Sequence, residues 1–398
     1  MTKKDTEVIE KMDATKQFCP NLKCKSRGEI GQGNIVIHCR KRCRYKCKTC
    51  GRTFNYRVGT AIEGLRKPTE LFETVISLLA YGCPIQAIVY TYKLDERTVA
   101  DWQYRAGKHC EKVHKAKIEQ EKLDLKHVQA DEIRVKARGS IIWIGLAIMV
   151  TTRLWIAGDV SKTRDSNLTD CLMQQIRKCC KCLSSLLICT DGFAAYPKSI
   201  LKAFREKMKE KPGPGAPKKV VWPDLHIGTV IKCTVKRHLT EVKRVMTYGS
   251  EEKAQRLLSI GNGGEVLNTS FIERLNGTFR ERLASLTRKS RHASAKEQTY
   301  YTGMYLVGSV YNFCIPHHQL SKSTTAGGFG WSCTPAMASG LTYHVWSVLE
   351  LLTYKVSPPP LPIPKKRGRP RTKLGTDPSM PEKCVSRSPK EGSCSSTS

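Results

Sequence analysis

The spacing of apolar positions divides the chain into parts with different predicted structure. Within residues 66–116, apolar side chains recur every three or four positions, which predicts helices. Residues 126–190 hold the apolar runs "HVQADEIRV", "IIWIGLAIMV", "RLWIAGDV" and "SLLICTD", with an amphipathic stretch before the last. This order predicts strand, strand, strand, helix, strand. Helical spacing returns over 269–286 and about 294–314, so the sequence predicts an α/β protein.

The three helices predicted within residues 66–116 resemble a helix-turn-helix unit. The first covers "PTELFETVISLLAYG", the second covers "PIQAIVYTY", and the third carries a stripe that includes Val99 and Trp102. A tight turn, "KLDE", precedes the third helix, as in DNA-binding units whose last helix enters a major groove. Arg97 and Thr98 at its start are the candidate DNA contacts. The alternative is a plain helical bundle that links two domains.

Two cysteine pairs near the N-terminus predict a zinc ribbon over residues 17–57. "FCPNLKC" and "YKCKTCGRTF" each place two thiols in a short turn, and a hairpin-length insert joins the turns. Four thiolates in this arrangement suit a tetrahedral Zn²⁺, and a small polar domain needs such an ion to fold. The predicted ligands are Cys19, Cys24, Cys47 and Cys50. Cys39 and Cys43 lie in the insert and are expected to be bystanders, although they could compete for the ion.

Charge indicates a polyanionic partner. The 398 residues contain 68 Lys plus Arg against 35 Asp plus Glu, which gives a formal net charge of +33. Such a surface favours double-stranded DNA, because binding phosphates releases counterions. The N-terminus lacks the apolar core of a signal peptide, and "IIWIGLAIMV" is too short to cross a bilayer. We therefore expect a cytoplasmic, DNA-associated chain, in the nucleoid if the host is prokaryotic, with reduced cysteines and no membrane partner.

The C-terminal part reads as an extension over 316–356 followed by a disordered basic tail over 357–398. The tail begins "SPPPLPIPKKRGRPRTK" and becomes rich in Ser and Pro. Its "RGR" core resembles an AT-hook, in which Arg367 and Arg369 would enter a narrow A·T minor groove. The alternative is a tail that binds phosphates without sequence preference.

Three acidic residues stand out against these patterns. Asp131 interrupts the first predicted strand, Asp191 ends the fourth, and Glu273 begins a helix. A ribonuclease-H-like sheet places its first and fourth strands side by side, which would bring the two aspartates together. Carboxylates at such positions need a compensating charge, either an arginine or a metal ion, and we expect a metal. Glu132 should face the other side of the strand as a surface acid.

The helix that contains Glu273 carries further polar residues at helical spacing. Asn276, Gly277 and Arg280 follow Glu273 at i+3, i+4 and i+7, on one face. Three converging carboxylates repel one another unless divalent cations lie between them. Two Mg²⁺ (or Mn²⁺) ions held in this way would support phosphoryl transfer to water or to a DNA 3′-hydroxyl.

Motifs around these acids resemble a known family. "ADEIR", "CTDGFAAYP" and above all "FIERLNGTFRERLASLTRKSR" are similar to motifs of the DDE transposases of bacterial insertion sequences, insertion-element-one type. The resemblance runs from about Cys19 to the basic tail. It implies a ribonuclease-H-like mixed-sheet catalytic domain over 126–315, with an insertion at about 205–265, preceded by the zinc ribbon and the helix-turn-helix.

The same resemblance implies the activity and the site. Asp131, Asp191 and Glu273 would be the magnesium-binding catalytic triad, and Arg274, Asn276 and Arg280 would hold substrate phosphates. The expected function is cleavage at element ends and joining of 3′-hydroxyl ends to target DNA. Because two ends must be paired, a homo-oligomer in the DNA complex is expected. A non-catalytic DNA-binding regulator (a domesticated relative) and a structure-selective nuclease remain as alternatives.

Overall fold

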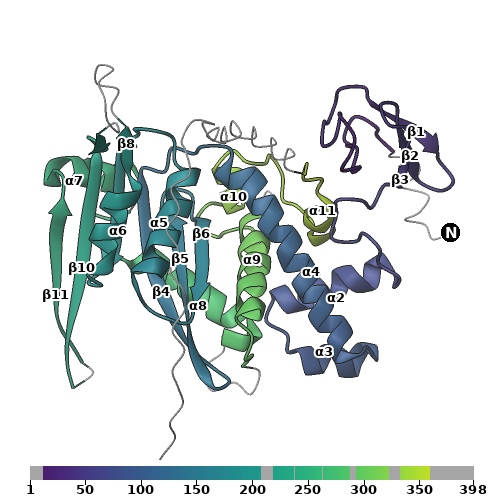
Figure 1. The fold of residues 1–398 in the computed structure, drawn as a ribbon. Helices are drawn as coiled ribbons and strands as arrows, with labels where there is room; N and C mark the ends of the chain where they lie inside the picture. The colour runs from purple at the N-terminus through teal and green to yellow at the C-terminus, as the bar shows by residue number, and fades with distance from the viewer. Residues whose placement is uncertain are drawn as a thin grey trace, which may run out of the picture. The chain divides into compact units, whose positions relative to one another are not determined.

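Figure 1 shows the protein as a computed structural model. The structure describes residues 12–207, 218–236, 238–261, 263–286, 293–321 and 332–358. The basic tail with Arg367 and Arg369, and most of the proline- and lysine-rich loop that precedes residue 218, lie outside these residues.

The N-terminal part forms a small antiparallel sheet in the order β1-β2-β3. Its strands are β1 (Ile35–Cys39), β2 (Arg44–Cys47) and β3 (Thr53–Asn55). Tyr45 is buried in a cluster with Phe54, and their stacked rings lie 5.9 Å apart. The rest of this cluster consists largely of cysteine side chains, so the unit has little apolar surface to stabilise it.

The three predicted helices are confirmed as α2 (Thr69–Ala80), α3 (Ile85–Tyr92) and α4 (Glu96–His114), and a π-helical turn follows over Lys115–Glu119. The Asp95 side chain caps α4 by accepting from the Arg97 amide. Trp102 on the predicted stripe packs edge-on against Phe72 of α2 at 5.2 Å. The C-terminal half of α4 is buried as well, and its residues belong to the same hydrophobic cluster as the central sheet.

The central sheet has six strands in the order β11-β10-β7-β4-β5-β6. β7 runs parallel to both β4 and β10, and the other neighbouring pairs are antiparallel. The strands are β4 (His127–Ala137), β5 (Ser140–Met149), β6 (Leu154–Ser161), β7 (Leu186–Asp191), β10 (Leu225–Val235) and β11 (His238–Tyr248). The four strands predicted from residues 126–190 are therefore confirmed, and the fold is a mixed α/β arrangement.

The region predicted as an insertion, about 205–265, contributes to the sheet itself. It contains β10 and β11, together with a separate hairpin of β8 (Arg205–Lys207) and β9 (Lys219–Val221). Within this region β10 is part of the central sheet, because its apolar residues Leu225 and Ile227 are fully buried and pair with β7.

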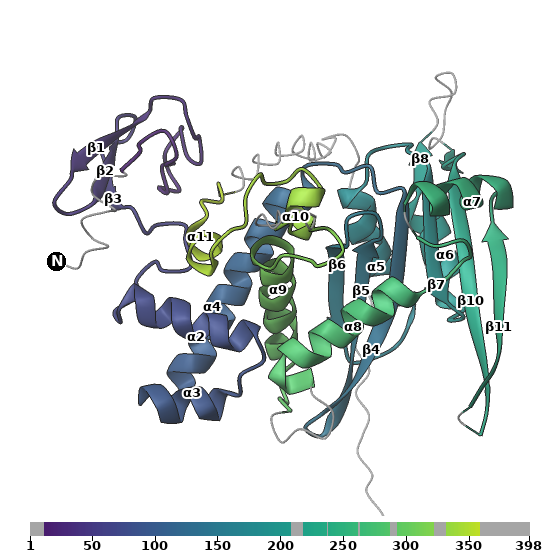
Figure 2. The same ribbon diagram turned by 180° about the vertical axis from the view of Figure 1, so that it is seen from behind.

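Helices cover both faces of the sheet (Figures 1 and 2). α5 (Ser166–Cys179) and α6 (Ala195–Ala203) lie on one face. α7 (Glu251–Ile260) and α8 (Ser270–Arg282) lie on the other. The long α9 packs along α4 and β6, and the chain continues through two short helices. These last elements are α9 (Glu297–Cys314), α10 (Pro335–Ala338) and α11 (Val348–Thr353), and a 3₁₀ turn spans Ala284–Leu286.

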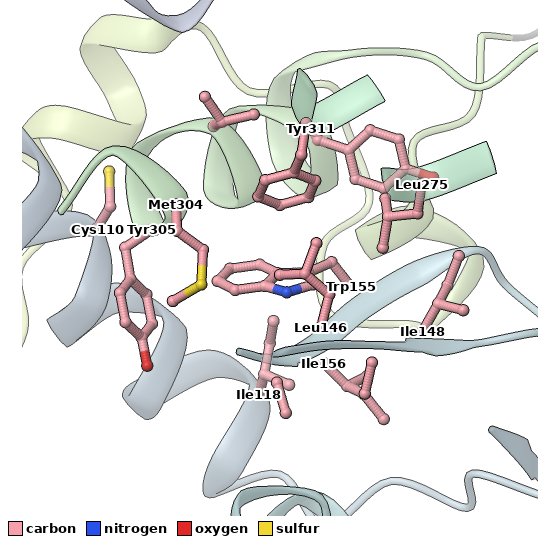
Figure 3. Packing of buried hydrophobic residues seen from close by; sticks show 14 of the residues in the cluster. Cys110, Ile118, Leu146, Ile148, Trp155, Ile156, Leu275, Met304, Tyr305 and Tyr311 are labelled. Atoms are coloured by element: carbon pink, nitrogen blue, oxygen red, sulfur yellow. The ribbon is translucent and has the colours of Figure 1, made fainter. Parts of the chain in front are cut away.

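Trp155 of β6 is the centre of the core (Figure 3). Met304 and Tyr305 of α9 lie on one side of its indole, and Leu275 of α8 and Ile148 of β5 lie on the other. Its backbone is held as well, because Asn312 of α9 both accepts from the Trp155 amide and donates to its carbonyl. The core thus ties the sheet to α8 and α9.

We expect Gly308→Ala to destabilise the protein strongly. A Cβ at Gly308 in α9 would lie 2.2 Å from the buried Trp155 ring, which cannot move away. Overpacking of this kind costs about 1–3 kcal/mol or more. The control is Gly277→Ala in α8, where a Cβ meets nothing within 4 Å and helix propensity favours alanine. Urea unfolding measures the free energy of unfolding of the two variants. Equal values would contradict the close contact between Gly308 and Trp155.

Candidate functional site

Asp131 and Asp191 lie together on the two central strands of the sheet. Asp131 is on β4 and Asp191 ends β7, and the parallel register pairs Ala130 with Thr190. The residues after this pair are the two aspartates, so the strand pairing alone places them side by side. Oxygen atoms of Asp131, Glu132 and Asp191 lie within 4.8 Å of one another, a separation that a bound cation could bridge.

Glu132 belongs to this acidic group, and its prediction as a surface acid was wrong. It does point to the opposite face of the sheet from Asp131, as strand alternation requires. That face is covered by α5 and α6, however, and the Glu132 side chain is only 1% exposed. Burial raises the pKa of its carboxyl, while interactions with Tyr196 and Arg164 oppose the shift.

Arg164 supplies the positive charge for two of the acids. Its Nη2 lies 2.9 Å from Glu132 Oε2 and 2.8 Å from Asp191 Oδ2. The guanidinium is 4.2 Å from the centre of the Phe193 ring, which restricts its position. A metal rather than an arginine was expected to answer the charge of Asp191; the structure provides an arginine contact, and Asp191 Oδ1 accepts from the Phe193 amide.

Asp131 faces α8 and has no arginine partner among the described contacts. Asn276 of α8 donates a hydrogen bond of 2.8 Å to its Oδ2. Burial, together with the neighbouring charges of Asp191, Glu132 and Glu273, raises the pKa of Asp131 to about 7. Ionisation of the Asp131 carboxyl is therefore unfavourable in the folded chain.

The raised pKa of Asp131 predicts a stability change with pH. The folded chain holds this proton up to about pH 7, whereas an unfolded Asp loses it near its ordinary pKa of 3.8. Stability should therefore fall as the pH rises through this window. With no divalent cation added, the free energy of unfolding of Asp131→Asn relative to that of the wild type should increase by about 1–3 kcal/mol as the pH rises from 5 to 8. Unfolding curves with equal pH dependence would contradict this.

Glu273 lies near the group but outside the set of mutually close oxygens. Its Oε1 accepts from Thr269 Oγ1 at 2.6 Å and forms an ion pair with Lys232 of β10. Its side chain is 44% exposed. The charge of Glu273 contributes to the raised pKa of Asp131, after burial and the charges of Asp191 and Glu132. The predicted trio is thus assembled in part, with Glu132 in the close position and Glu273 beside it.

The other predicted DNA-contact residues have different environments. Asn276 is 2% exposed and bound to Asp131, so it is placed to orient that carboxylate rather than to reach a phosphate. Arg274 is exposed on α8, and Arg280 is half-buried near the end of that helix. Arg97 is exposed and Thr98 half-buried in the first turn of α4.

The four predicted zinc ligands form one cluster. Cys19 Sγ lies 3.6 Å from Cys50 Sγ, and Cys24 Sγ lies 3.8 Å from Cys47 Sγ. Tetrahedral Zn²⁺ with Zn–S bonds of about 2.3 Å requires S···S separations of about 3.8 Å. Contacts from Asn21 and the Arg52 amide lower the pKa of Cys50 to about 6, which favours its thiolate. The donor set and its spacing therefore fit a structural metal, and Cys39 and Cys43 lie outside the set.

Sequence reasoning missed Arg164 and Lys232 and misplaced Glu132. Arg164 lies in a loop, and Lys232 lies on β10, within the region predicted as an insertion, so no spacing links either residue to the acids. The adjacency of Glu132 to Asp131 was a usable signal, because a strand covered on both faces buries both neighbours.

Comparison with known proteins adds no relative: no family model and no curated protein matches this chain. None of the helices in the described part of the chain combines the length and apolar character needed to cross a bilayer. The site must therefore be interpreted from its own geometry.

Proposed function

We propose that the protein is a DNA transposase of the DDE type, with Asp131, Asp191 and Glu273 as its acidic residues. The observation that carries the proposal is the convergence of Asp131 and Asp191 from parallel neighbouring strands, next to the helix that bears Glu273. The strand order β6-β5-β4-β7-β10 also agrees with a ribonuclease-H-like sheet, and β11 would be an addition to its edge.

The acidic group fits divalent cations of the Mg²⁺ or Mn²⁺ type. These ions prefer carboxylate oxygens, and the mutual repulsion that raises the pKa of Asp131 is the repulsion that a cation would remove. When bound, such cations activate a water or a 3′-hydroxyl and stabilise the leaving oxygen of a phosphodiester. Asp131 and Asp191 would hold them, and Glu273 would join after separating from Lys232.

The remaining residues position the acids. Asn276 holds Asp131 through its amide, and Arg164, anchored on the buried Glu132, holds Asp191. Lys232 and Arg164 also place two positively charged side chains in contact with the acids, and these would attract a phosphate. This combination of fixed acids and cations suits transfer reactions at a phosphodiester.

The N-terminal parts are proposed to recognise DNA. A zinc ribbon built on the four cysteines and a helix-turn-helix formed by α2–α4 would bind the element ends. Since residues from Val99 onward on α4 include many buried side chains, the contact falls to its first turn, with Arg97 and Thr98. We further propose pairing of two ends by a homo-oligomer and association with DNA in the cell.

The test is a strand-transfer assay with the purified chain, Mg²⁺ and DNA that carries the sequences flanking the gene. Release of 3′-hydroxyl ends and their joining to target DNA is the expected result. Cleavage without joining would instead identify a structure-selective nuclease. Binding to the ends without cleavage would overturn the proposal.

A non-catalytic DNA-binding regulator is the second candidate. The observation in its favour is that Asp191 and Glu273 each form an ion pair, with Arg164 and Lys232. A protein that had given up metal chemistry would keep such pairs permanently. Titration with Mg²⁺ distinguishes the two functions, because the transposase should bind the ion in the millimolar range, whereas a regulator that keeps both ion pairs should not.

A further inference from the structure

A cavity lies beside α8, on another side of the helix from Glu273. It is about 180 Å³ in volume and is formed by α8, the turn between β5 and β6, and the segment that follows α9. The residues on which its chemistry depends are Arg153, Arg274, Arg282, His317, Phe271 and Tyr311. Arg274 and Arg282 are two helical turns apart, so one side of α8 presents both guanidinium groups.

The charges at this cavity are uniformly positive. In the described part of the chain, no ion pair joins Arg153, Arg274 or Arg282 to a carboxylate. The charged groups that act on the His317 imidazole are Arg153, Arg274 and His318, and together with burial they lower its pKa. Three guanidinium groups that face one cavity without an acid are costly unless an anion joins them.

Buried nitrogen atoms at the cavity also lack a partner. Arg153 Nε and Arg282 Nη1 are buried donors that form no hydrogen bond within the described structure, and His317 Nδ1, which donates in one of the two imidazole tautomers, has none there either. Buried donors normally have partners, so two unpaired guanidinium nitrogens at one cavity indicate a missing acceptor.

Arg153 is held in place by the fold. It occupies the tight turn between β5 and β6 with a φ of 60°, and its Nη1 donates to the Val150 carbonyl. Its guanidinium lies 3.9 Å from the centre of the Phe271 ring, and the residue as a whole is 9% exposed. Burial and the nearby Arg274 lower its pKa. A cation fixed in this way is organised before any ligand arrives, which favours binding of a compact anion.

We propose that this cavity binds a phosphate group, with Arg153, Arg274 and Arg282 as its ligands. Guanidinium groups match the oxygens of phosphate in geometry and charge, and a cavity of this volume accommodates one phosphate but not a nucleotide base with its sugar. The phosphate belongs either to a free inorganic ion or to a DNA strand. The second source rests on the proposed function, because α8 would then hold DNA on one side while Glu273 acts on another.

The first experiment uses inorganic phosphate as the probe, with the full-length protein at constant ionic strength. Phosphate in excess over its dissociation constant should raise the melting temperature by about 2 °C relative to chloride. Arg282→Gln and Arg274→Gln should each abolish most of this shift. The matched control is Arg256→Gln, which removes the same charge from an exposed ion pair on α7. A full shift in both cavity variants, or loss of the shift in the control as well, would overturn the proposal.

The second experiment distinguishes the sources of phosphate with a duplex oligonucleotide. If the ligand is a DNA phosphate, Arg282→Gln should reduce the slope of log affinity against log salt by about 1, whereas a free-phosphate site leaves it unchanged. Inorganic phosphate should compete with the duplex for the wild-type protein if the ligand is a DNA phosphate, and should not compete if the site binds only the free ion. A phosphate shift in a protein with no strand-transfer activity would disprove only the proposed function. Strand transfer without any phosphate shift would disprove only the phosphate site.

Discussion

Strand cleavage and joining should be lost in Asp191→Asn and in Glu273→Gln, by at least about 10³-fold, with DNA binding retained. Both changes remove a negative charge from the acidic group while keeping the size of the side chain. Asp191 is one of the two carboxylates that the parallel pairing of β4 and β7 brings together. Without it, a divalent cation loses the carboxylate that lies beside Asp131 on the neighbouring strand, and Glu132, the other close carboxylate, is engaged by Arg164. Binding should be unchanged or tighter, since the surface gains positive charge.

The control is Asp224→Asn. Asp224 directly precedes β10, beside the start of β7 rather than its end, and forms an ion pair with Lys253. This variant should cleave and join like the wild type, which separates local chemistry from a general change in charge. Gel-based strand transfer and fluorescence anisotropy measure the two properties on one DNA substrate.

The strand-transfer activities of Glu132→Gln and Glu273→Gln identify which of the two carboxylates is the third metal ligand. Glu132 lies within ligand distance of the aspartates but is occupied by Arg164, whereas Glu273 is more exposed and nearer to solvent. We expect Glu273→Gln to be inactive and Glu132→Gln to keep part of the activity, because Glu132 positions Arg164. The reverse result would move the metal ligand to Glu132. Normal activity in Asp191→Asn would refute the whole assignment.

Removal of the metal from the cysteine cluster should unfold the N-terminal sheet and abolish recognition of element ends. The free energy of zinc binding in such small units is about 10–16 kcal/mol, far more than their apolar core supplies. Cys47→Ser removes one sulfur from a set whose spacing fits tetrahedral Zn²⁺. We expect bound zinc to fall from one ion per chain to none, and residues 12–57 to become sensitive to protease.

Cys39→Ser is the matched control for this experiment. Cys39 ends β1 in the same small sheet, but its thiol lies outside the cluster. The variant should retain its zinc and its protease resistance. Zinc loss in both variants would contradict the four-cysteine assignment. End binding that survives metal removal would show that another part of the chain recognises DNA.

Local residue patterns are sufficient to predict a helix but not the element against which it packs. The stripe with Val99 and Trp102 predicted α4, because helical spacing of buried residues is a local property. The same pattern did not indicate that the second half of α4 is buried against α9. There, Gly107 lies so close to Thr302 that a Cβ would be 2.3 Å from its carbonyl oxygen. That contact joins residues almost two hundred positions apart, and no local pattern encodes it.

The sequence by itself determined helices α2 to α5, α8 and α9, the first four strands of the main sheet, the cysteine set and the two aspartates. Each of these depends on residue spacing within a segment or on a residue type that is costly without a partner. Only the tertiary structure decided that Glu132 is buried, that Arg164 and Lys232 answer the acids, and that three arginines share one cavity. These relations depend on which elements become neighbours after the chain has folded, and burial beside a neighbour sets the free energy of each charge.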